Sequence, residues 1–174
     1  MNKILLHICC GICSGWSVEK LRQDGYAVTG IFYNPNIQPQ AEYERRLEAA
    51  KKACAVQEIE LINAPYDSGR WLSLTKGSEN EPEGGKRCSV CYRMRLEYTA
   101  LKARELGIEY FTTTLSISPH KDSALINRIG KEIAGECFKE YNFKKEDGFK
   151  KSNQFSLTHG LYRQNYCGCA YSMR

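Results

Sequence analysis

Apolar and polar positions follow each other along the chain in blocks that predict strands and helices in turn. Five short apolar stretches, bounded by polar or glycine-containing sequence, are typical of buried parallel strands: residues 3–8, 27–33, 59–64, 110–115 and 137–143. The intervening patterns predict helices over 14–24, 40–56 and 89–106, from Ser118-Pro119 onward, and near 152–159.

This alternation, with short connections, predicts an α/β fold with a parallel sheet of about five strands and helices on both faces, a three-layer sandwich. Residues 66–87 are polar and rich in Gly and Glu, so we expect a long functional loop there, with one helical turn near 70–74. Residues 144–174 form a basic, cysteine-containing C-terminal segment. No repeat or linker indicates a second domain, so a single domain over 1–174 is expected.

Polar and thiol motifs follow four of the predicted strands. In parallel sheets, ligands bind beyond the carboxyl ends of the strands. The motifs at those ends are Cys9-Cys10, Asn34-Pro35-Asn36, Pro65-Tyr66-Asp67 and the segment 116–122. Their convergence predicts one active site at this edge of the sheet.

Composition narrows the class of protein. Of 174 residues, 42% are hydrophobic and 26% are charged, which excludes a largely disordered chain. No run of 18 apolar residues is present, so neither a membrane span nor a membrane partner is expected. The first ten residues resemble a strand more than a signal peptide, and we expect a cytoplasmic protein.

Nine cysteines are the unusual feature of the composition. An odd count within an α/β pattern argues against a secreted disulfide scaffold. Cys88 and Cys91 open a predicted helix, where the pKa of a thiol is lowered, and Cys9-Cys10 can supply two more ligands. Four thiolates suit either zinc or an iron–sulfur cluster, and the spacing alone does not decide between them. Two further interpretations stay open: a zinc that only fastens the long loop to the first strand, and free thiols that bind no metal.

The other cysteines carry separate expectations. Cys167 and Cys169, separated by one glycine, could form a strained, redox-active disulfide, hold a second metal or be incidental. Cys54 and Cys137 are predicted to lie in the core. Cys13 is either a third ligand in the first loop or a buried residue of the first helix.

A polar substrate would need further groups at the same edge. Asp122 could supply a proton, or it could be an exposed acid in the first turn of a helix. The remaining candidates for substrate binding, several of which could equally be turn or packing residues, are Tyr33, Asn34, Asn36, Ser118, Tyr162, Arg163 and Tyr166.

The charge balance indicates a phosphate-rich partner. The formal net charge is +5. Basic side chains gather around the Cys-x-x-Cys and in the C-terminal segment, where they could contact nucleic-acid phosphates: Lys86, Arg87, Arg93, Arg95, Lys144, Lys145, Lys150, Lys151 and Arg163.

Several strings together resemble one enzyme family, the cobalamin-independent QueH type of epoxyqueuosine reductase. They occur in order over nearly the whole chain: LLHICCGIC, FYNPNIQPQAEYERR, RCSVCYRMRL, FTTTLSISPHKD, FKKEDGFKKS and YRQNYCGC. One departure is the first loop, Cys-Cys-Gly-Ile-Cys, where Ala-Pro is expected in the middle. It affects the stiffness of the loop more than the identity of the ligands.

The resemblance implies the last step of queuosine biosynthesis, the reduction of epoxyqueuosine at the wobble position of tRNA, with two electrons from an unidentified donor and two protons. It implies an adenine-nucleotide-hydrolase-like fold without a nucleotide loop. No G-x-x-x-x-G-K-[ST] or G-x-G-x-x-G string is present, so no nucleotide cofactor is expected. The resemblance also favours a 4Fe-4S cluster over zinc, because zinc cannot pass electrons. By position, the implied cluster ligands are Cys9, Cys10, Cys88 and Cys91.

The same resemblance makes Cys167 and Cys169 a redox pair or the holders of an additional iron ion. Two alternatives stay open at this point: a tRNA-modifying sulfurtransferase or ligase on the same fold, and a zinc-stapled RNA-binding module without catalytic activity. ATP independence would count against the first alternative, and a brown protein purified without oxygen against the second.

Overall fold

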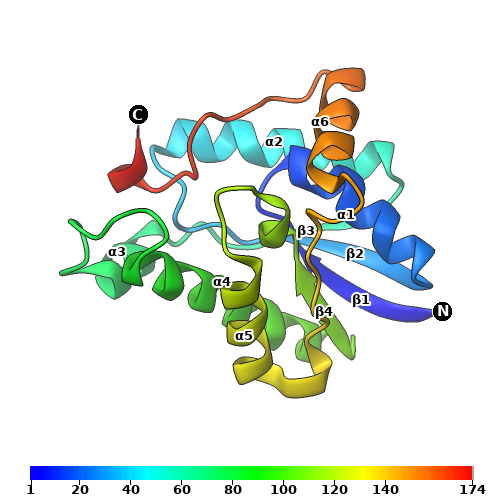
Figure 1. Cartoon of the computed structure of the whole chain (residues 1–174), viewed down its shortest axis with the longest axis horizontal. Helices are drawn as coiled ribbons and strands as arrows, with labels where there is room; N and C mark the ends of the chain where they lie inside the picture. Colours follow the sequence, from blue (N-terminus) through cyan, green and yellow to red (C-terminus); the bar gives the residue numbers. More distant parts are fainter. Residues whose placement is uncertain (174) are drawn as a thin grey trace.

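The computed structural model describes residues 1–173, and its centre is a sheet of four parallel strands (Figure 1). The spatial order is β3-β2-β1-β4. The strands are β1 (Asn2–His7), β2 (Tyr26–Phe32), β3 (Leu61–Asn63) and β4 (Tyr110–Thr113). Because every strand points the same way, the turns that follow β1, β2 and β4 meet at one edge.

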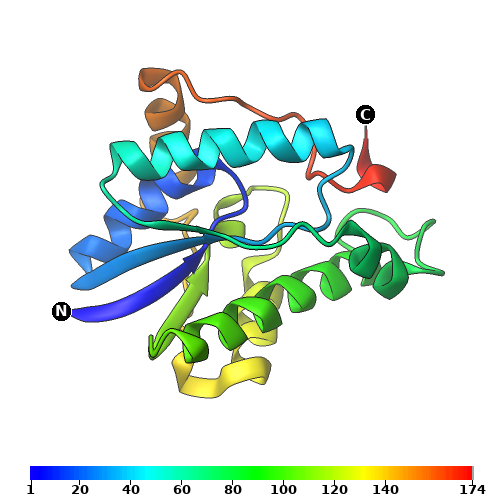
Figure 2. The ribbon, with the colours of Figure 1, turned by 180° about the vertical axis from the view of Figure 1, so that it is seen from behind.

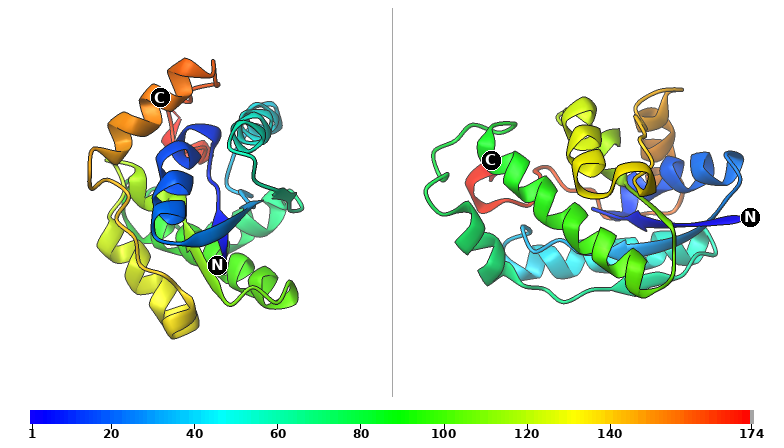
Figure 3. Two further views of the ribbon diagram at one scale, coloured as in Figure 1. Left: turned by 90° about the vertical axis from the view of Figure 1, so that its right-hand side faces the viewer. Right: turned by 90° about the horizontal axis from the view of Figure 1, so that it is seen from below.

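Helices cover both faces of this sheet (Figures 1 and 2). One layer consists of α1 (Gly11–Gln23), α2 (Gln40–Val56) and α6 (Gly148–Thr158). The other consists of α3 (Ser68–Thr75), α4 (Lys86–Glu105) and α5 (Ser123–Ala134). The views along the sheet show the strands between these two layers (Figure 3). The predicted three-layer α/β sandwich is therefore confirmed.

Alternation along β1 explains the two layers. Ile4 and Leu6 are fully buried in the core beneath α1 and α2, whereas Leu5 is buried in the core on the α4 side. Successive side chains of a strand point to opposite faces, so a strand that is buried on both faces must be apolar throughout. No helix within residues 1–173 combines the length and the apolar character needed to cross a bilayer.

The prediction of a fifth strand over 137–143 is wrong. The chain forms a short 3-10 helix at Gly135–Cys137, and only Phe138 makes a ladder contact, with Phe111 of β4. Gly135 has a positive φ, which turns the chain away from an extended course. Cys137 is exposed, so its predicted core position is also wrong.

Several helix boundaries also differ from the predictions. The helix α1 begins at Gly11 instead of Ser14, and α6 begins at Gly148, before the predicted start near Ser152. The loop 66–87 contains the two-turn helix α3, which buries Trp71, and α4 begins at Lys86 instead of Ser89. Ser118 does not begin a helix, because a 3-10 turn over Thr114–Ile117 precedes it and α5 starts only at Ser123.

Candidate functional site

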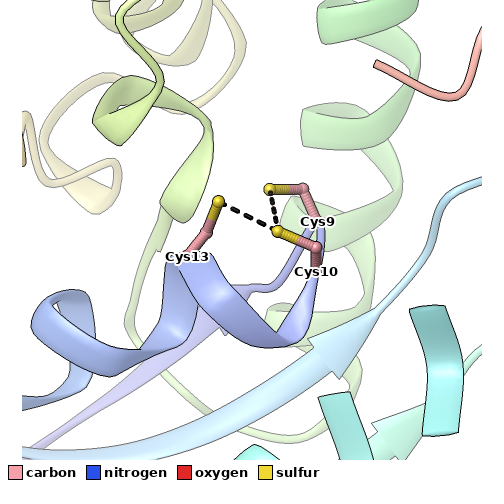
Figure 4. A group of neighbouring side chains, drawn as sticks. All are labelled: Cys9, Cys10 and Cys13. Atoms are coloured by element: carbon pink, nitrogen blue, oxygen red, sulfur yellow. Dashed lines mark hydrogen bonds between the residues drawn. The ribbon is translucent and has the colours of Figure 1, made fainter. Parts of the chain in front are cut away.

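Three cysteines meet where β1 passes into α1. Cys9 and Cys10 lie in the turn after the strand, and Cys13 lies in the first turn of the helix (Figure 4). Their Sγ atoms all lie within 4.8 Å of one another, with 3.8 Å between Cys9 and Cys10 and 3.0 Å between Cys10 and Cys13. We call these residues the first thiol group. Three converging sulfurs are a ligand set for a soft metal.

Gly11 allows this turn to pack closely against α2. A Cβ atom at Gly11 would lie 2.5 Å from the carbonyl oxygen of Ala49, so any larger residue would push α1 away from α2. Cys10 is the N-cap of α1, and the unpaired backbone N–H groups at a helix N-terminus favour negatively charged sulfur. The local sequence thus both shapes and polarises the first thiol group.

Hydrogen bonds lower the pKa of one thiol in this group. The thiols of Cys10 and Cys13 lower the pKa of Cys9 well below its ordinary value, and the positive charges of Arg95 and Lys121 lower it further, against the effect of burial. The pKa of Cys13 is raised by its hydrogen bonds with the other two thiols and by burial. Cys9 is therefore the thiol of this group whose pKa is held low.

Thr114 supports Cys9 from the neighbouring strand end. Its Oγ1 accepts a hydrogen bond from the backbone N–H of Cys9 at 3.1 Å and donates one to the Cys9 Sγ at 3.2 Å. Thr114 is fully buried, so these bonds do not compete with water. Sequence reasoning missed this residue, because it placed position 114 inside a predicted strand.

His7 ties together the strand ends below the first thiol group. It is fully buried; its Nε2 donates to the Tyr33 carbonyl oxygen at 3.0 Å, and its Nδ1 accepts from the Thr113 hydroxyl at 2.9 Å. Burial, assisted by the charge of Arg95, lowers the pKa of His7 to about 3. His7 is thus a neutral structural link between β1, β2 and β4.

A second thiol group lies beside the first. Two of its members come from the start of α4 and two from the C-terminal segment: Cys88, Cys91, Cys167 and Cys169. All four line a narrow cavity of about 20 Å³. A hydrogen bond from Cys169 is the main cause that lowers the pKa of Cys167 to about 5, while the pKa of Cys169 is raised. Burial raises the pKa of Cys88. This group therefore also pairs a thiol of lowered pKa, Cys167, with one of raised pKa, Cys169.

Residues 160–173, which we call the C-terminal strap, carry two of these thiols along α2 to the start of α4 (Figures 1 and 2). A buried ion pair within α2 anchors the strap. The Arg46 Nε donates to the Glu42 carboxylate at 2.8 Å, and its Nη2 donates to the Tyr166 carbonyl oxygen at 3.0 Å. The Tyr162 hydroxyl donates to Glu42 at 2.8 Å.

A larger cavity, of about 280 Å³, opens between the first thiol group and the strap. Cys9, Cys13 and Cys167 all border it, and Arg95, Lys121 and Cys167 line both cavities. Among the described residues that line it, the charged side chains are four cations and one carboxylate: Arg46, Arg95, Lys121, Arg163 and Glu83. A polar, positively charged cavity bordered by thiols suits an anionic or hydrogen-bonding substrate.

Several predicted substrate-binding residues lie at these cavities. Ser118, Arg163 and Tyr166 line the larger cavity, and Asn36 lines the narrow one. Asn36 is buried and its Oδ1 has no hydrogen-bond partner within the described part of the chain.

Three other predicted residues have different surroundings. Asn34 is buried, donates to the Ile8 carbonyl oxygen at 2.9 Å and accepts from Arg95 at 2.6 Å. Tyr33 is buried and stacks on Tyr98, with 3.8 Å between ring centroids. Asp122 is exposed and caps α5 by accepting from two backbone N–H groups, and it lines neither cavity. Asp122 as a proton donor therefore stays a prediction.

Some of the basic residues near the Cys-x-x-Cys point inward. Arg87 is buried and donates to three carbonyl oxygens of the preceding loop, at 2.7–3.0 Å. Arg95 is buried between Asn34 and the Cys91 Sγ, which is 3.9 Å away. Arg93 pairs with Glu132. The expectation that these arginines contact phosphates is therefore wrong for Arg87, which holds the preceding loop in place. The contact of Arg95 with Cys91 could have been predicted, because Arg95 lies four residues after Cys91 and so on the same face of the helix.

These features describe an α/β protein with a thiol-lined, cationic site at the carboxyl edge of a parallel sheet. Residues 4–174 match the family model described as epoxyqueuosine reductase QueH. A protein of that name from Streptococcus pyogenes serotype M1 is 38% identical, over 98% of this chain and 70% of that protein. Another from Histophilus somni is 41% identical, over 99% of this chain and 73% of that protein. The chain therefore belongs to the epoxyqueuosine reductase QueH family, as its motifs indicated.

A solved structure shares the fold. It is the U34-tRNA thiolase NcsA from Methanococcus maripaludis with its 4Fe-4S cluster, with a TM-score of 0.59 and 17% identity. The likeness covers 100% of this chain and 63% of that protein. At this identity it supports the α/β architecture alone.

Proposed function

We propose that this protein reduces epoxyqueuosine in tRNA to queuosine. Family membership supports the reaction, and one observation carries it to this site: thiols from two groups border a single cationic cavity, with Cys9 and Cys13 on one side and Cys167 on the other. A location in the reducing cytoplasm is consistent with so many free thiols.

The reaction requires a complete balance of electrons and protons. Both C–O bonds of the epoxide break, and a double bond forms between the two ring carbons. The oxygen leaves as water after it takes up two protons, and two electrons enter from an external donor. The chain must therefore bind the substrate, deliver electrons one or two at a time, and supply protons near the epoxide oxygen.

We propose a 4Fe-4S cluster as the electron carrier, with ligands from both thiol groups: Cys9, Cys10, Cys88 and Cys91. The donor set fits, since four soft thiolates hold such clusters and the sulfurs of the first thiol group already converge within 4.8 Å. When bound, the cluster supplies single-electron transfer. Cys13 lies 3.0 Å from Cys10, so it competes with the α4 cysteines for a ligand role.

The remaining residues have proposed roles around the substrate. Cys167 and Cys169 form the redox pair or hold an additional iron ion. Lys121 and Arg163 attract the tRNA, whose phosphates are anionic, while Ser118 and Tyr166 line the cavity and contact the substrate. The Tyr166 hydroxyl donates to the Gln38 carbonyl oxygen, so it can only accept from the substrate. The excess of basic over acidic residues, +5 in total, suits the same partner.

Serine variants of the cysteines, purified without oxygen, test this proposal. Cys88→Ser and Cys91→Ser should lose the iron–sulfur chromophore, because serine is a poor ligand for soft metals. Cys167→Ser should keep the chromophore and lose multiple turnover. Cys13→Ser decides whether Cys13 is a ligand, and Cys137→Ser, at an exposed position, is the matched control.

The measurements are iron and sulfide content and the conversion of epoxide to alkene in tRNA. Stoichiometric zinc without iron, after anaerobic reconstitution, would contradict the cluster. Loss of one iron along with activity in Cys167→Ser would replace the redox pair with a second metal site.

A further inference from the structure

The tyrosines that the sequence suggested for stacking on a base are already engaged. Tyr33 stacks on a neighbouring half-buried tyrosine, Tyr98. Tyr162 and Tyr166 lie under guanidinium groups of α2, at 5.4 and 4.9 Å from the ring centroids. If an RNA base stacks at this site, another aromatic side chain must provide the platform.

Phe149, the second residue of α6, has the required position. Its side chain is 43% exposed and lines the larger cavity. Phe155, on the same helix, pairs instead with His159, at 4.7 Å between ring centroids, whereas Phe149 has no aromatic partner among residues 1–173. A single exposed apolar residue is ordinary by itself. Its place at the rim of a substrate-sized cavity is what points to a ligand.

The basic side chains that share the cavity with this ring indicate the chemistry of the ligand. Lys121 and Arg163 line the same cavity, His120 adds a hydrogen-bonding imidazole, and Lys150, the next residue on α6, is exposed. Proteins that bind single-stranded nucleic acid combine a basic surface, which follows the phosphates, with aromatic rings on which bases stack. A phenyl ring between cations at the mouth of a cavity has both parts of that arrangement.

We propose that Phe149 stacks on the base next to the reacting nucleotide in the RNA loop. This inference rests on the proposed function and specifies how the RNA is held. A nucleotide that enters a cavity of about 280 Å³ must leave its stack, so the flanking base loses a stacking partner. The Phe149 ring replaces that partner, while His120, Lys121 and Arg163 contact the phosphates on either side.

The test compares holoenzyme variants on an anticodon stem–loop RNA that carries epoxyqueuosine. Phe149→Ala should raise the KM for this RNA about tenfold, within a range of about five- to 150-fold, which corresponds to the loss of one stacked base. The kcat and the cluster spectrum should stay unchanged. Phe149→Trp should restore the KM, because a larger ring also stacks.

A matched control is available on the same helix. Leu157 is 60% exposed and does not line the cavity, so Leu157→Ala should leave the KM for the RNA unchanged. As a second readout, 5-iodouridine at the flanking position should crosslink on irradiation, and peptide mapping should locate the crosslink at Phe149.

Two results would overturn the inference. The first is an unchanged KM in Phe149→Ala together with a crosslink at another residue. The second is an equal loss of activity on the free epoxyqueuosine nucleoside, since Phe149 would then contact the reacting base instead of its neighbour. If wild-type protein reduces neither substrate, the proposed function fails, whereas the crosslink still tests the stacking.

Discussion

The two thiol groups border the same cavity, yet they are built in different ways. The first lies within residues 9–13, where a strand end, a glycine and the first turn of α1 determine its shape. The second joins the start of α4 to the C-terminal strap, which is distant in sequence. Local geometry is therefore enough for the first group, whereas the second depends on whatever holds the strap in place.

The contacts that anchor the two groups also differ: those of the first group lie in the sheet, and those of the second lie on the strap. The first rests on the sheet, through the buried His7 and Thr114. The second depends on contacts that hold the strap. These include the buried ion pair Glu42–Arg46, with both side chains at most 4% exposed, and a hydrogen bond of 2.8 Å from the Gln38 N–H to the Gly168 carbonyl oxygen. A buried charge pair is costly to break on one side only, because the remaining charge stays out of water. Substitutions at each anchor should consequently affect one group and spare the other.

Arg46→Met should have the largest effect. It leaves the Glu42 carboxylate buried without its partner and removes the bond to the Tyr166 carbonyl oxygen, at a cost of about 3–5 kcal/mol in the free energy of unfolding. In metal-free protein, Cys167 and Cys169 should then react faster with iodoacetamide. The measurements are urea unfolding and alkylation followed by mass spectrometry.

Arg45→Met is the control for this variant. Its guanidinium lies 3.8 Å from the same carboxylate, but the side chain is 59% exposed, so the substitution should cost about 1 kcal/mol or less. Faster alkylation of Cys9 in Arg46→Met would contradict the separation of the two groups, since the first group does not depend on the strap.

The second prediction concerns pH and the anchor of the first group. The pKa of His7 is lowered to about 3 in the fold, from 6.5, so the unfolded chain binds a proton that the folded protein does not. The contribution of neutral His7 to the free energy of unfolding is therefore fully present above pH 6.5. It is lost as the pH falls towards about 3, with a slope of about 1.4 kcal/mol per pH unit.

A difference measurement isolates this contribution from the carboxylates that titrate in the same range. His7→Gln cannot be protonated, so the stability of wild-type metal-free protein relative to this variant should shrink between pH 6.5 and 4.5. A constant difference over that range would show that His7 is already charged in the folded state.

Thr114→Val should have a smaller effect, again confined to the first group. It removes the hydroxyl that donates to the Cys9 Sγ and accepts from the Cys9 backbone N–H, which leaves a buried donor unpaired, at a cost of about 1–3 kcal/mol. The pKa of Cys9 should rise, so its alkylation at neutral pH should slow. Thr114→Ser keeps the hydroxyl and should behave as wild type; equal alkylation rates in both variants would remove Thr114 from the site.

The same contrast explains which parts could be predicted from the sequence. Periodicity and turn residues are local signals, so the four strands of the sheet, the bounds of α2 and the convergence of motifs at one sheet edge could be predicted. The burial of Glu42 and Arg46 could not, because an acid and a base four residues apart on a helix usually form a solvent-exposed pair. Their partners come from the strap, which is distant in sequence: the Tyr166 carbonyl oxygen accepts from Arg46, and the Tyr162 hydroxyl donates to Glu42.

The prediction of a fifth strand over 137–143 was wrong for a related reason. An apolar, aromatic stretch near Phe138 indicates burial, but it does not specify a ladder. Phe138 packs against Gly130 of α5, where a Cβ would lie 2.5 Å from the ring. One inserted ring therefore satisfies the apolar pattern without a strand, and Cys137, just before it, stays outside the core.

Cys137→Ser should have the smallest effect and defines the baseline for every cysteine variant above. Cys137 is exposed at the end of a 3-10 turn, so the free energy of unfolding should change by about 0.5 kcal/mol or less.

Cys54 is the contrasting position outside both groups: it is 1% exposed, and burial raises the pKa of its thiol to about 12. Cys54→Ser should cost about 1–3 kcal/mol, because a buried hydroxyl without a partner replaces a weakly polar thiol. Neither variant should change the alkylation rate of Cys9 or Cys167, as both lie outside the two groups. If Cys137→Ser destabilised the protein as much as Cys54→Ser, serine itself would account for part of the losses at the proposed metal-binding positions, and those losses could not be assigned to the two thiol groups.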